Sequence, residues 1–205
     1  YQKVESNKGR TYQARLFKTL PAVTESKPTV LFALGLYEYS YGNVGKARSY
    51  FEQAELIVLA TEDPRIICQV YIYAGYSALR EDDPFTSLDK ANAALVAAQQ
   101  YDYAKGRSNA NFALAYTRIV VGDNQLALET LKAAETDLLP ESDLLEHAII
   151  LNSKASIYLT LGRLDIAKPM FEKAIQYYDS IKNPRGRMSS MLSIADIEFE
   201  LDNKN

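Results

Sequence analysis

A 40-residue period runs through the chain and constrains its fold more than any other feature. Small residues recur at this interval inside similar apolar segments, as in Ala-Leu-Gly-Leu-Tyr at 33–37 and Tyr-Ala-Gly-Tyr-Ser at 73–77. The members of this series are Gly35, Gly75, Ala115, Ala155 and Ala195. Periods of roughly 20–50 residues are typical of solenoids, in which each structural unit packs on its neighbours.

Other kinds of residue keep the same interval without an insertion or deletion. Two of these series consist of small residues, one consists of large residues, and one consists of residues that are typical of turns. The small series are Ala47, Ser87, Ala127 and Ala167, and Ala14, Ala54, Ala94, Ala134 and Ala174. The large series is Phe51, Leu131 and Phe171, with Ala91 as its exception, and the turn series is Gly42, Asp82, Gly122, Gly162 and Asp202.

These series predict an all-α fold, a right-handed α-solenoid of antiparallel helical hairpins. Apolar residues recur at steps of three and four on both sides of each turn residue, which is the pattern of two amphipathic helices. Small residues where helices cross allow close approach of the backbones, and a large side chain there would cost roughly 1–3 kcal/mol. Glycine at the turn tolerates a backbone that ends a helix.

Turn-rich joins containing Pro64, Pro140 and Pro184 separate successive hairpins, since proline stops one helix and can open the next. We expect one continuous solenoid domain and interpret the chain as part of a longer protein. Residues 1–27 would be the second helix of a truncated repeat, and 188–205 the first helix of a further one. The expected complete repeats are 28–67, 68–107, 108–147 and 148–187.

Composition argues against several kinds of partner and cofactor. The net charge of −3 lacks the basic excess of a nucleic-acid-binding protein, so no nucleic acid is expected. The sequence has no apolar run of about 18 residues, and we expect no membrane contact by this segment. One cysteine and one histidine do not make a usual zinc site, so neither a metal nor another cofactor is predicted.

No constellation of residues predicts catalysis, and this segment is not expected to be an enzyme. Cys68 has apolar neighbours and is expected to be a buried structural thiol, while His147 is expected at the surface or in a helix cap. The acidic turn at 81–83 is interpreted as solvated. The basic triplets at 105–107 and 185–187 either bind an anion or meet the carbonyl end of the preceding helix.

The order of small, large and small residues resembles the tetratricopeptide repeat. That family carries Leu-Gly and then Tyr in the first helix, and Ala, an aromatic residue and Ala in the second. Here the first repeat reads Leu34, Gly35, Ala47, Phe51 and Ala54, and the fourth reads Ala155, Tyr158, Ala167, Phe171 and Ala174. The 40-residue period resembles the long-repeat form found in bacterial regulators, because the usual period is about 34 residues.

The resemblance implies a concave groove lined by residues two, five, nine and twelve of each repeat. Aromatic side chains there would bring large contact area at low entropic cost. Asn109 and Asn152 lack the lysines of a carboxylate clamp, so we expect a protein or peptide with apolar anchors. The predicted binding residues are Phe32, Leu36, Tyr39, Gln69, Ile72, Tyr76, Asn109, Phe112, Tyr116 and Asn152.

Two other uses of these aromatic residues stay open, namely packing within the groove and contact with a homodimer mate or an attached domain. The resemblance implies a protein-interaction module, and we expect the sensory or regulatory region of a larger bacterial signal-transduction protein. Its output domain would be, for example, a diguanylate cyclase, a histidine kinase or a transcription activator, and a periplasmic location is slightly favoured over a cytoplasmic one. The alternative is a constitutive scaffold that assembles a multiprotein complex.

Overall fold

The computed structural model describes residues 28–202, and the truncated repeat expected at 1–27 lies outside them. The described residues form α-helices and one short 3₁₀ helix, with no strand among them. The elements are α2 (Pro28–Ser40), α3 (Val44–Val58), η2 (Leu59–Thr61), α4 (Pro64–Leu79), α5 (Pro84–Gln100), α6 (Ala104–Val120), α7 (Asn124–Thr136), α8 (Leu144–Thr160), α9 (Leu164–Ser180) and α10 (Pro184–Asp202).

The helices keep the 40-residue interval that the small residues predicted. First helices of hairpins begin at 64, 104, 144 and 184, and second helices begin at 44, 84, 124 and 164. The first helices α4, α6, α8 and α10 begin four residues before the expected starts of their repeats, whereas α2 begins at the expected start, residue 28. The boundaries of the repeats themselves stay a prediction.

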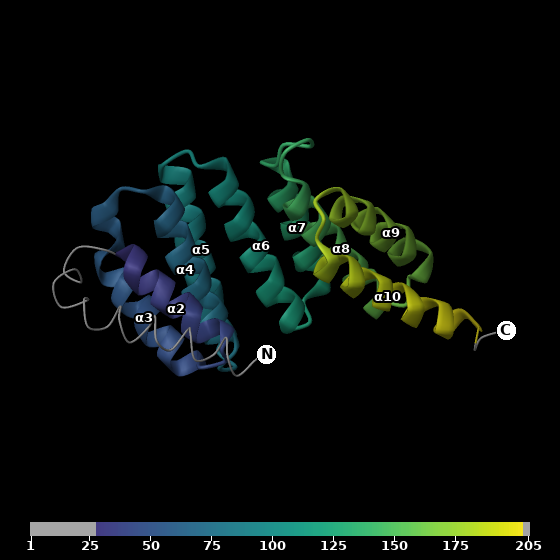
Figure 1. The fold of residues 1–205 in the computed structure, drawn as a ribbon, viewed down its shortest axis with the longest axis horizontal. Helices are drawn as coiled ribbons and strands as arrows, with labels where there is room; N and C mark the ends of the chain where they lie inside the picture. Colours follow the sequence, from purple (N-terminus) through teal and green to yellow (C-terminus); the bar gives the residue numbers. More distant parts are fainter. Residues whose placement is uncertain (1–27, 203–205) are drawn as a thin grey trace. The chain divides into compact units, whose positions relative to one another are not determined.

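The chain divides into two compact units, Tyr1–Tyr101 and Asp102–Asn205. In the first unit, α2 pairs with α3 and α4 pairs with α5 (Figure 1). In the second unit, α6 pairs with α7 and α8 pairs with α9, while α10 packs on α9. Both units are built from the helical hairpins that the period predicted. No helix among residues 28–202 has the length and apolar character needed to span a bilayer.

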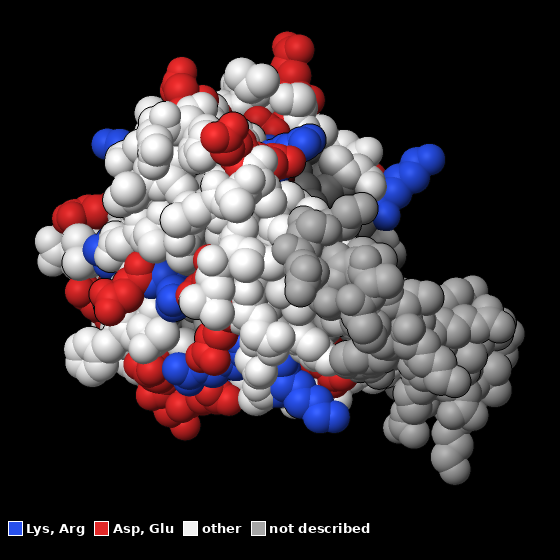
Figure 2. Space-filling model, turned by 90° about the vertical axis from the view of Figure 1, so that its left-hand side faces the viewer, with Lys and Arg blue, Asp and Glu red and all other residues white. Residues whose placement is uncertain are grey.

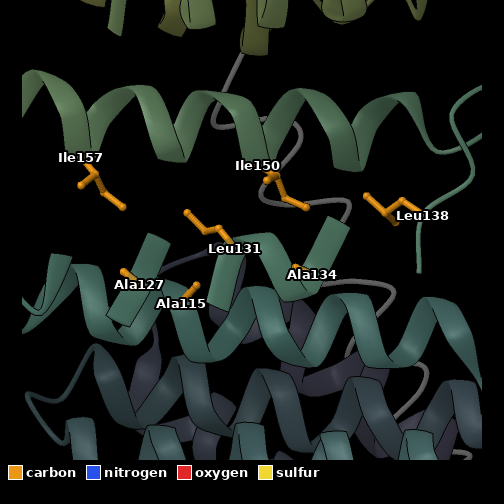
Figure 3. Packing of buried hydrophobic residues seen from close by; sticks show 7 residues of the cluster. All are labelled: Ala115, Ala127, Leu131, Ala134, Leu138, Ile150 and Ile157. Atoms are coloured by element: carbon orange, nitrogen blue, oxygen red, sulfur yellow. The ribbon is translucent and has the colours of Figure 1, made fainter. Parts of the chain in front are cut away.

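Small residues lie at the helix crossings, as the sequence indicated. Ala115 and Ala127 are fully buried between α6 and α7, and Leu131 points from α7 toward Ile150 and Ile157 on α8 (Figure 3). The small side chains at these positions therefore allow the two helices of a hairpin to come into contact. The large residue, Leu131, fills the space between this hairpin and the next. The residues of the small series are buried throughout the complete hairpins: Ala47, Ala54, Ser87, Ala94, Ala127, Ala134, Ala167 and Ala174.

The second hairpin shows how the exception in the large series is accommodated. Ala91 replaces the large residue and is itself buried. A β-carbon on Gly75 would lie 3.1 Å from the carbonyl oxygen of Ser87. The backbones of α4 and α5 therefore approach each other more closely than a larger residue at position 75 would permit. Ala195, the last member of the first small series, is exposed on α10.

Left-handed residues end the helices at regular intervals. Gly42, Gly122 and Gly162 have φ of 80°, 84° and 70°, and Asp82 takes the same place with φ of 59°. These four residues confirm the predicted turn series, whereas Asp202 still belongs to α10. The joins between hairpins use the same device at Glu62, Asp102 and Lys182.

Helix starts are specified by proline and aspartate. Pro64, Pro84 and Pro184 are the first residues of their helices, where the missing N–H costs nothing. Asp63 and Asp83 precede two of these prolines and accept hydrogen bonds from the backbone N–H of Arg65 and of Thr86, each at 3.0 Å.

Candidate functional site

The first helices of the hairpins carry the predicted binding residues, and each unit presents its own set. In the first unit, α2 lies beside α4; in the second, α6 lies beside α8 and α8 beside α10. The first unit holds Phe32, Leu36, Tyr39, Gln69, Ile72 and Tyr76, and the second holds Asn109, Phe112, Tyr116 and Asn152.

An aromatic cluster joins α2, α3 and α4 in the first unit. Tyr73 is its centre, with its ring centroid 5.6 Å from that of Phe32, 6.0 Å from Phe51 and Tyr39, and 5.7 Å from Tyr76. Tilted and edge-on ring pairs at these separations contribute stabilisation in addition to that from the burial of their apolar surface. The predicted set missed Tyr73 because Tyr73 is the sixth residue of the repeat that begins at 68, and only positions two, five, nine and twelve were assigned to the groove.

Two predicted groove residues belong to the interior of the first unit. Phe32 is 7% exposed and Ile72 is 6% exposed, so neither offers a side chain to a ligand at the surface. Phe32 packs on the rings of Phe51 and Tyr73, which shows that the fifth position of a repeat turns inward here. The assignment of Phe32 and Ile72 to an open groove is therefore wrong.

The surface of this unit keeps the remaining aromatic positions partly exposed. The guanidinium of Arg80 lies over the ring of Tyr39, 4.6 Å from its centroid, and its Nη1 donates to the carbonyl oxygen of Tyr39 at 3.2 Å. Leu36 and Tyr76 are half-buried and Gln69 is exposed. On the face seen in Figure 2, lysine and arginine lie in separate groups interleaved with aspartate and glutamate.

A buried carboxylate on α2, that of Glu38, makes polar contacts with the following turn and with α3. Glu38 is 3% exposed and accepts a hydrogen bond from Nδ2 of Asn43 at 2.6 Å. Burial and the negative charge of Glu38 raise the pKa of Tyr50. A buried carboxylate held in this way ties α2 to the turn and to α3.

A small pocket opens between α6 and α8 in the second unit. Its volume is about 50 Å³, and its walls are mostly apolar. The lining residues are Ser108, Asn109, Phe112, Glu146, Ile149 and Ile150. Asn109 and Phe112 were predicted binding residues, and Ile149 occupies the second position of its repeat, which the resemblance assigns to the groove.

The other two predicted residues of this unit lie on the same two helices, outside the pocket lining. Tyr116 is 43% exposed and stacks on Phe112, with 6.4 Å between the ring centroids. Asn152 accepts a hydrogen bond from the hydroxyl of Ser190 at 2.7 Å through its Oδ1, which joins α8 to α10. Tyr116 therefore adds exposed aromatic surface, while Asn152 is partly engaged within the protein.

Charged residues lie at the N-terminal ends of α6 and α8. Nζ of Lys105 is 2.7 Å from Oε1 of Glu146 and 3.4 Å from Oδ1 of Asp143. The Glu146 carboxylate raises the pKa of Lys105. The backbone N–H of Leu139, which donates to Asp143 at 2.8 Å, lowers the pKa of that aspartate, and Lys105 adds to the effect.

Arginine in the same basic triplet is also held by carboxylates. Arg107 contacts Asp137 through two nitrogens, at 3.0 Å and 2.7 Å, and its Nη1 is 2.8 Å from Oδ1 of Asp102. In the second triplet, Arg187 is 2.9 Å from Asp179. Three of the four cations of the basic triplets, Lys105, Arg107 and Arg187, are thus paired with carboxylates, which disfavours an anion site there.

Cys68 and His147 have structural surroundings. The Cys68 thiol donates to the carbonyl oxygen of Ala94 at 3.5 Å, and burial raises its pKa to about 11. His147 is partly exposed near the start of α8, and its ring stacks on that of Tyr177, with 5.9 Å between the centroids. Within the described residues, His, Cys, Asp and Glu do not gather in threes that could hold a metal ion.

The family model of the tetratricopeptide repeat matches residues 148–180, which span most of α8 and α9. No curated protein matches the chain significantly. Solved structures share its fold. The apo form of the quorum sensor NprR from B. thuringiensis has a TM-score of 0.75 and 17% identity over 98% of this chain and 57% of that chain.

Two further structures are similar to this chain. A Rap protein in complex with the competence and sporulation factor has a TM-score of 0.73 and 17% identity, over 91% of this chain and 54% of that chain. YrrB, a tetratricopeptide repeat protein with an unusual peptide-binding site, has a TM-score of 0.51 and 16% identity, over 89% of this chain and 91% of that chain. This chain thus has the helical-hairpin fold of tetratricopeptide solenoids, and it spans little more than half the length of NprR and the Rap protein.

Proposed function

We propose that this chain is a peptide-binding module whose binding surfaces are the exposed parts of the first helices. The observation that carries the proposal is the apolar pocket between α6 and α8, with Asn109 at its wall and exposed Tyr116 one helical turn beyond Phe112. An apolar recess takes a side chain, and an amide side chain beside it offers both a donor and an acceptor to a peptide backbone.

The similar structures support a peptide as the partner. The Rap structure contains the competence and sporulation factor, and YrrB is described by its peptide-binding site. In the first unit, Leu36, Tyr39, Gln69 and Tyr76 offer the corresponding surface. Apolar anchors suit both surfaces, because half-buried aliphatic and aromatic residues gain most from the removal of water.

We further propose that the module is the sensory or regulatory region of a larger bacterial signal-transduction protein, with a diguanylate cyclase or histidine kinase as the output domain. The likeness to the quorum sensor NprR supports a regulatory role. This chain matches 57% of the NprR chain, so NprR contains a further region that has no counterpart in this chain. Peptide binding would then alter the pitch of the solenoid or its docking on the output domain.

A constitutive scaffold is the second candidate, and ion pairs between helices favour it. Lys154 on α8 is 2.5 Å from Glu135 on α7, and Lys168 on α9 is 3.0 Å from Glu198 on α10. Such pairs hold neighbouring helices in one arrangement. Small-angle scattering with and without a bound peptide separates the candidates, because a sensor changes its radius of gyration and a scaffold does not.

Peptide binding itself is tested with a display library of random heptapeptides. We expect the protein to enrich peptides with apolar anchors, and expect Tyr116→Ala and Tyr76→Ala to weaken their binding while helicity by circular dichroism stays nearly intact. Phe85→Ala is the matched control, because Phe85 is 81% exposed on α5, a second helix. A library with no enriched sequence contradicts the proposed function.

A further inference from the structure

We propose that the pocket between α6 and α8 binds a small aliphatic side chain of a peptide whose neighbouring residue is lysine or arginine. This inference rests on the proposed peptide-binding function and adds the chemistry of the ligand. It assigns the apolar walls to the anchor and the acidic end of the two helices to the neighbouring cation.

The size of the pocket favours an aliphatic anchor over an aromatic one. Its volume is about 50 Å³. A buried cavity of about 150 Å³ is known to hold a benzene ring, so a phenyl group needs roughly three times the space that is present. Phe112, Ile149 and Ile150 supply apolar walls for the branched end of valine or leucine.

The charges around the pocket favour a cation beside this anchor. Two carboxylates, those of Asp143 and Glu146, share one cation, Lys105, and Glu146 lines the pocket. This group therefore carries a net charge of −1, which attracts a basic ligand residue and repels an acidic one.

Glu146 connects the anchor and the cation. It lines the pocket, and its side chain is only 20% exposed, so a ligand charge near it is less screened than at an open surface. Lys105, its partner, has a side chain that is 47% exposed and can move aside without leaving a buried cation. A ligand lysine or arginine can thus share Glu146 and Asp143 with Lys105.

The test uses the same heptapeptide display library and then synthetic peptides made from an enriched sequence. We expect the wild-type protein to enrich an aliphatic residue next to lysine or arginine. In a fluorescence anisotropy titration, Glu146→Gln should weaken binding of the basic peptide about fivefold, the upper end of the range for one partly exposed ion pair. It should leave unchanged the affinity for the peptide in which glutamine replaces the basic residue.

Two further variants separate the pocket from the surface charge. Ile149→Phe fills the pocket and should weaken both peptides more than tenfold, with an unchanged thermal midpoint showing that the fold is intact. Glu129→Gln removes an exposed carboxylate of α7 that does not line the pocket, and it should change neither affinity.

The outcomes distinguish this inference from the function on which it rests. If no peptide is enriched, peptide binding fails, and this inference fails with it. If peptides are enriched but bind Glu146→Gln and Ile149→Phe as they bind the wild type, peptide binding stands and the α6/α8 pocket is not its site. Enrichment of aromatic anchors or acidic neighbours overturns the ligand chemistry proposed here.

Discussion

The ring of Phe51 occupies the space that a side chain at residue 35 would need. A β-carbon on Gly35 would lie 2.4 Å from Cε1 of Phe51, well inside the distance of closest carbon contact. Tyr178 and Gly186 show the same relationship at α9 and α10, where the corresponding distance is also 2.4 Å. In both units, a large aromatic ring therefore packs directly on a glycine of a neighbouring helix.

Gly35→Ala should destabilise the first hairpin by about 1–3 kcal/mol, because the fully buried Phe51 ring has to move. The free energy of unfolding in urea measures the loss. Gly45→Ala is the matched control, since the nearest atom to its new β-carbon would be Oε1 of Glu81 at 3.7 Å. That variant should keep or slightly raise stability, and a loss equal to that of Gly35→Ala would contradict the steric explanation.

Gly122→Ala should lower stability by about 1–2 kcal/mol for a purely conformational reason, because φ is 84° and no other atom lies within 4 Å of the new β-carbon. Asp82 takes the equivalent turn with φ of 59°, so Asp82→Gly should raise stability by up to about 1 kcal/mol. Thermal unfolding of the two variants beside the wild type tests the pair. If the thermal midpoints of both variants shifted in the same direction, the backbone conformation of the turn would not be the cause of the change in stability.

Ala127→Leu should lower the free energy of unfolding by about 1–3 kcal/mol, because Ala127 has no exposed surface at the crossing of α6 and α7. Ala133→Leu introduces the same side chain at an exposed position of α7 and should be nearly neutral. A thermal midpoint of Ala127→Leu at or above that of the wild type would show that this site is not a close helix crossing.

Cys68 should react with a thiol reagent only when the protein opens. Burial raises its pKa to about 11, so at pH 8 nearly all of it is the unreactive thiol. Labelling with Ellman's reagent at pH 8 should be slow in buffer and complete within minutes in concentrated urea. Rapid stoichiometric labelling of the native protein would mean that α4 opens locally between Cys68 and α5.

The fold was predictable because one kind of residue marks each structural role. Gly35 and Ala127 mark helix crossings, Gly122 marks a turn, and Pro64 marks a helix start, and each of these roles depends on local geometry or on the contact of two neighbouring helices. The binding surface was less predictable. Phe32 and Ile72 were assigned to it by their places in the repeat, yet both are buried.

The reason is that a small rotation of a helix about its axis decides whether a residue at the edge of its apolar face is inside or outside. Position in the repeat defines the face only to within about one residue, or roughly 100°. Tyr73 at the centre of the aromatic cluster and Glu146 in the pocket wall lie at such edges, and their neighbours come from other helices.

The sequence by itself determined the period, the hairpins, the helix crossings and the turns, because each depends on residues that recur in phase and interact locally. Only the tertiary structure decided which aromatic residues are buried, which carboxylates hold Lys105 and Arg107, and where a pocket remains between α6 and α8. Those features depend on side chains from separate helices filling or leaving a shared space, and no pattern along one helix specifies how well its neighbour fills it.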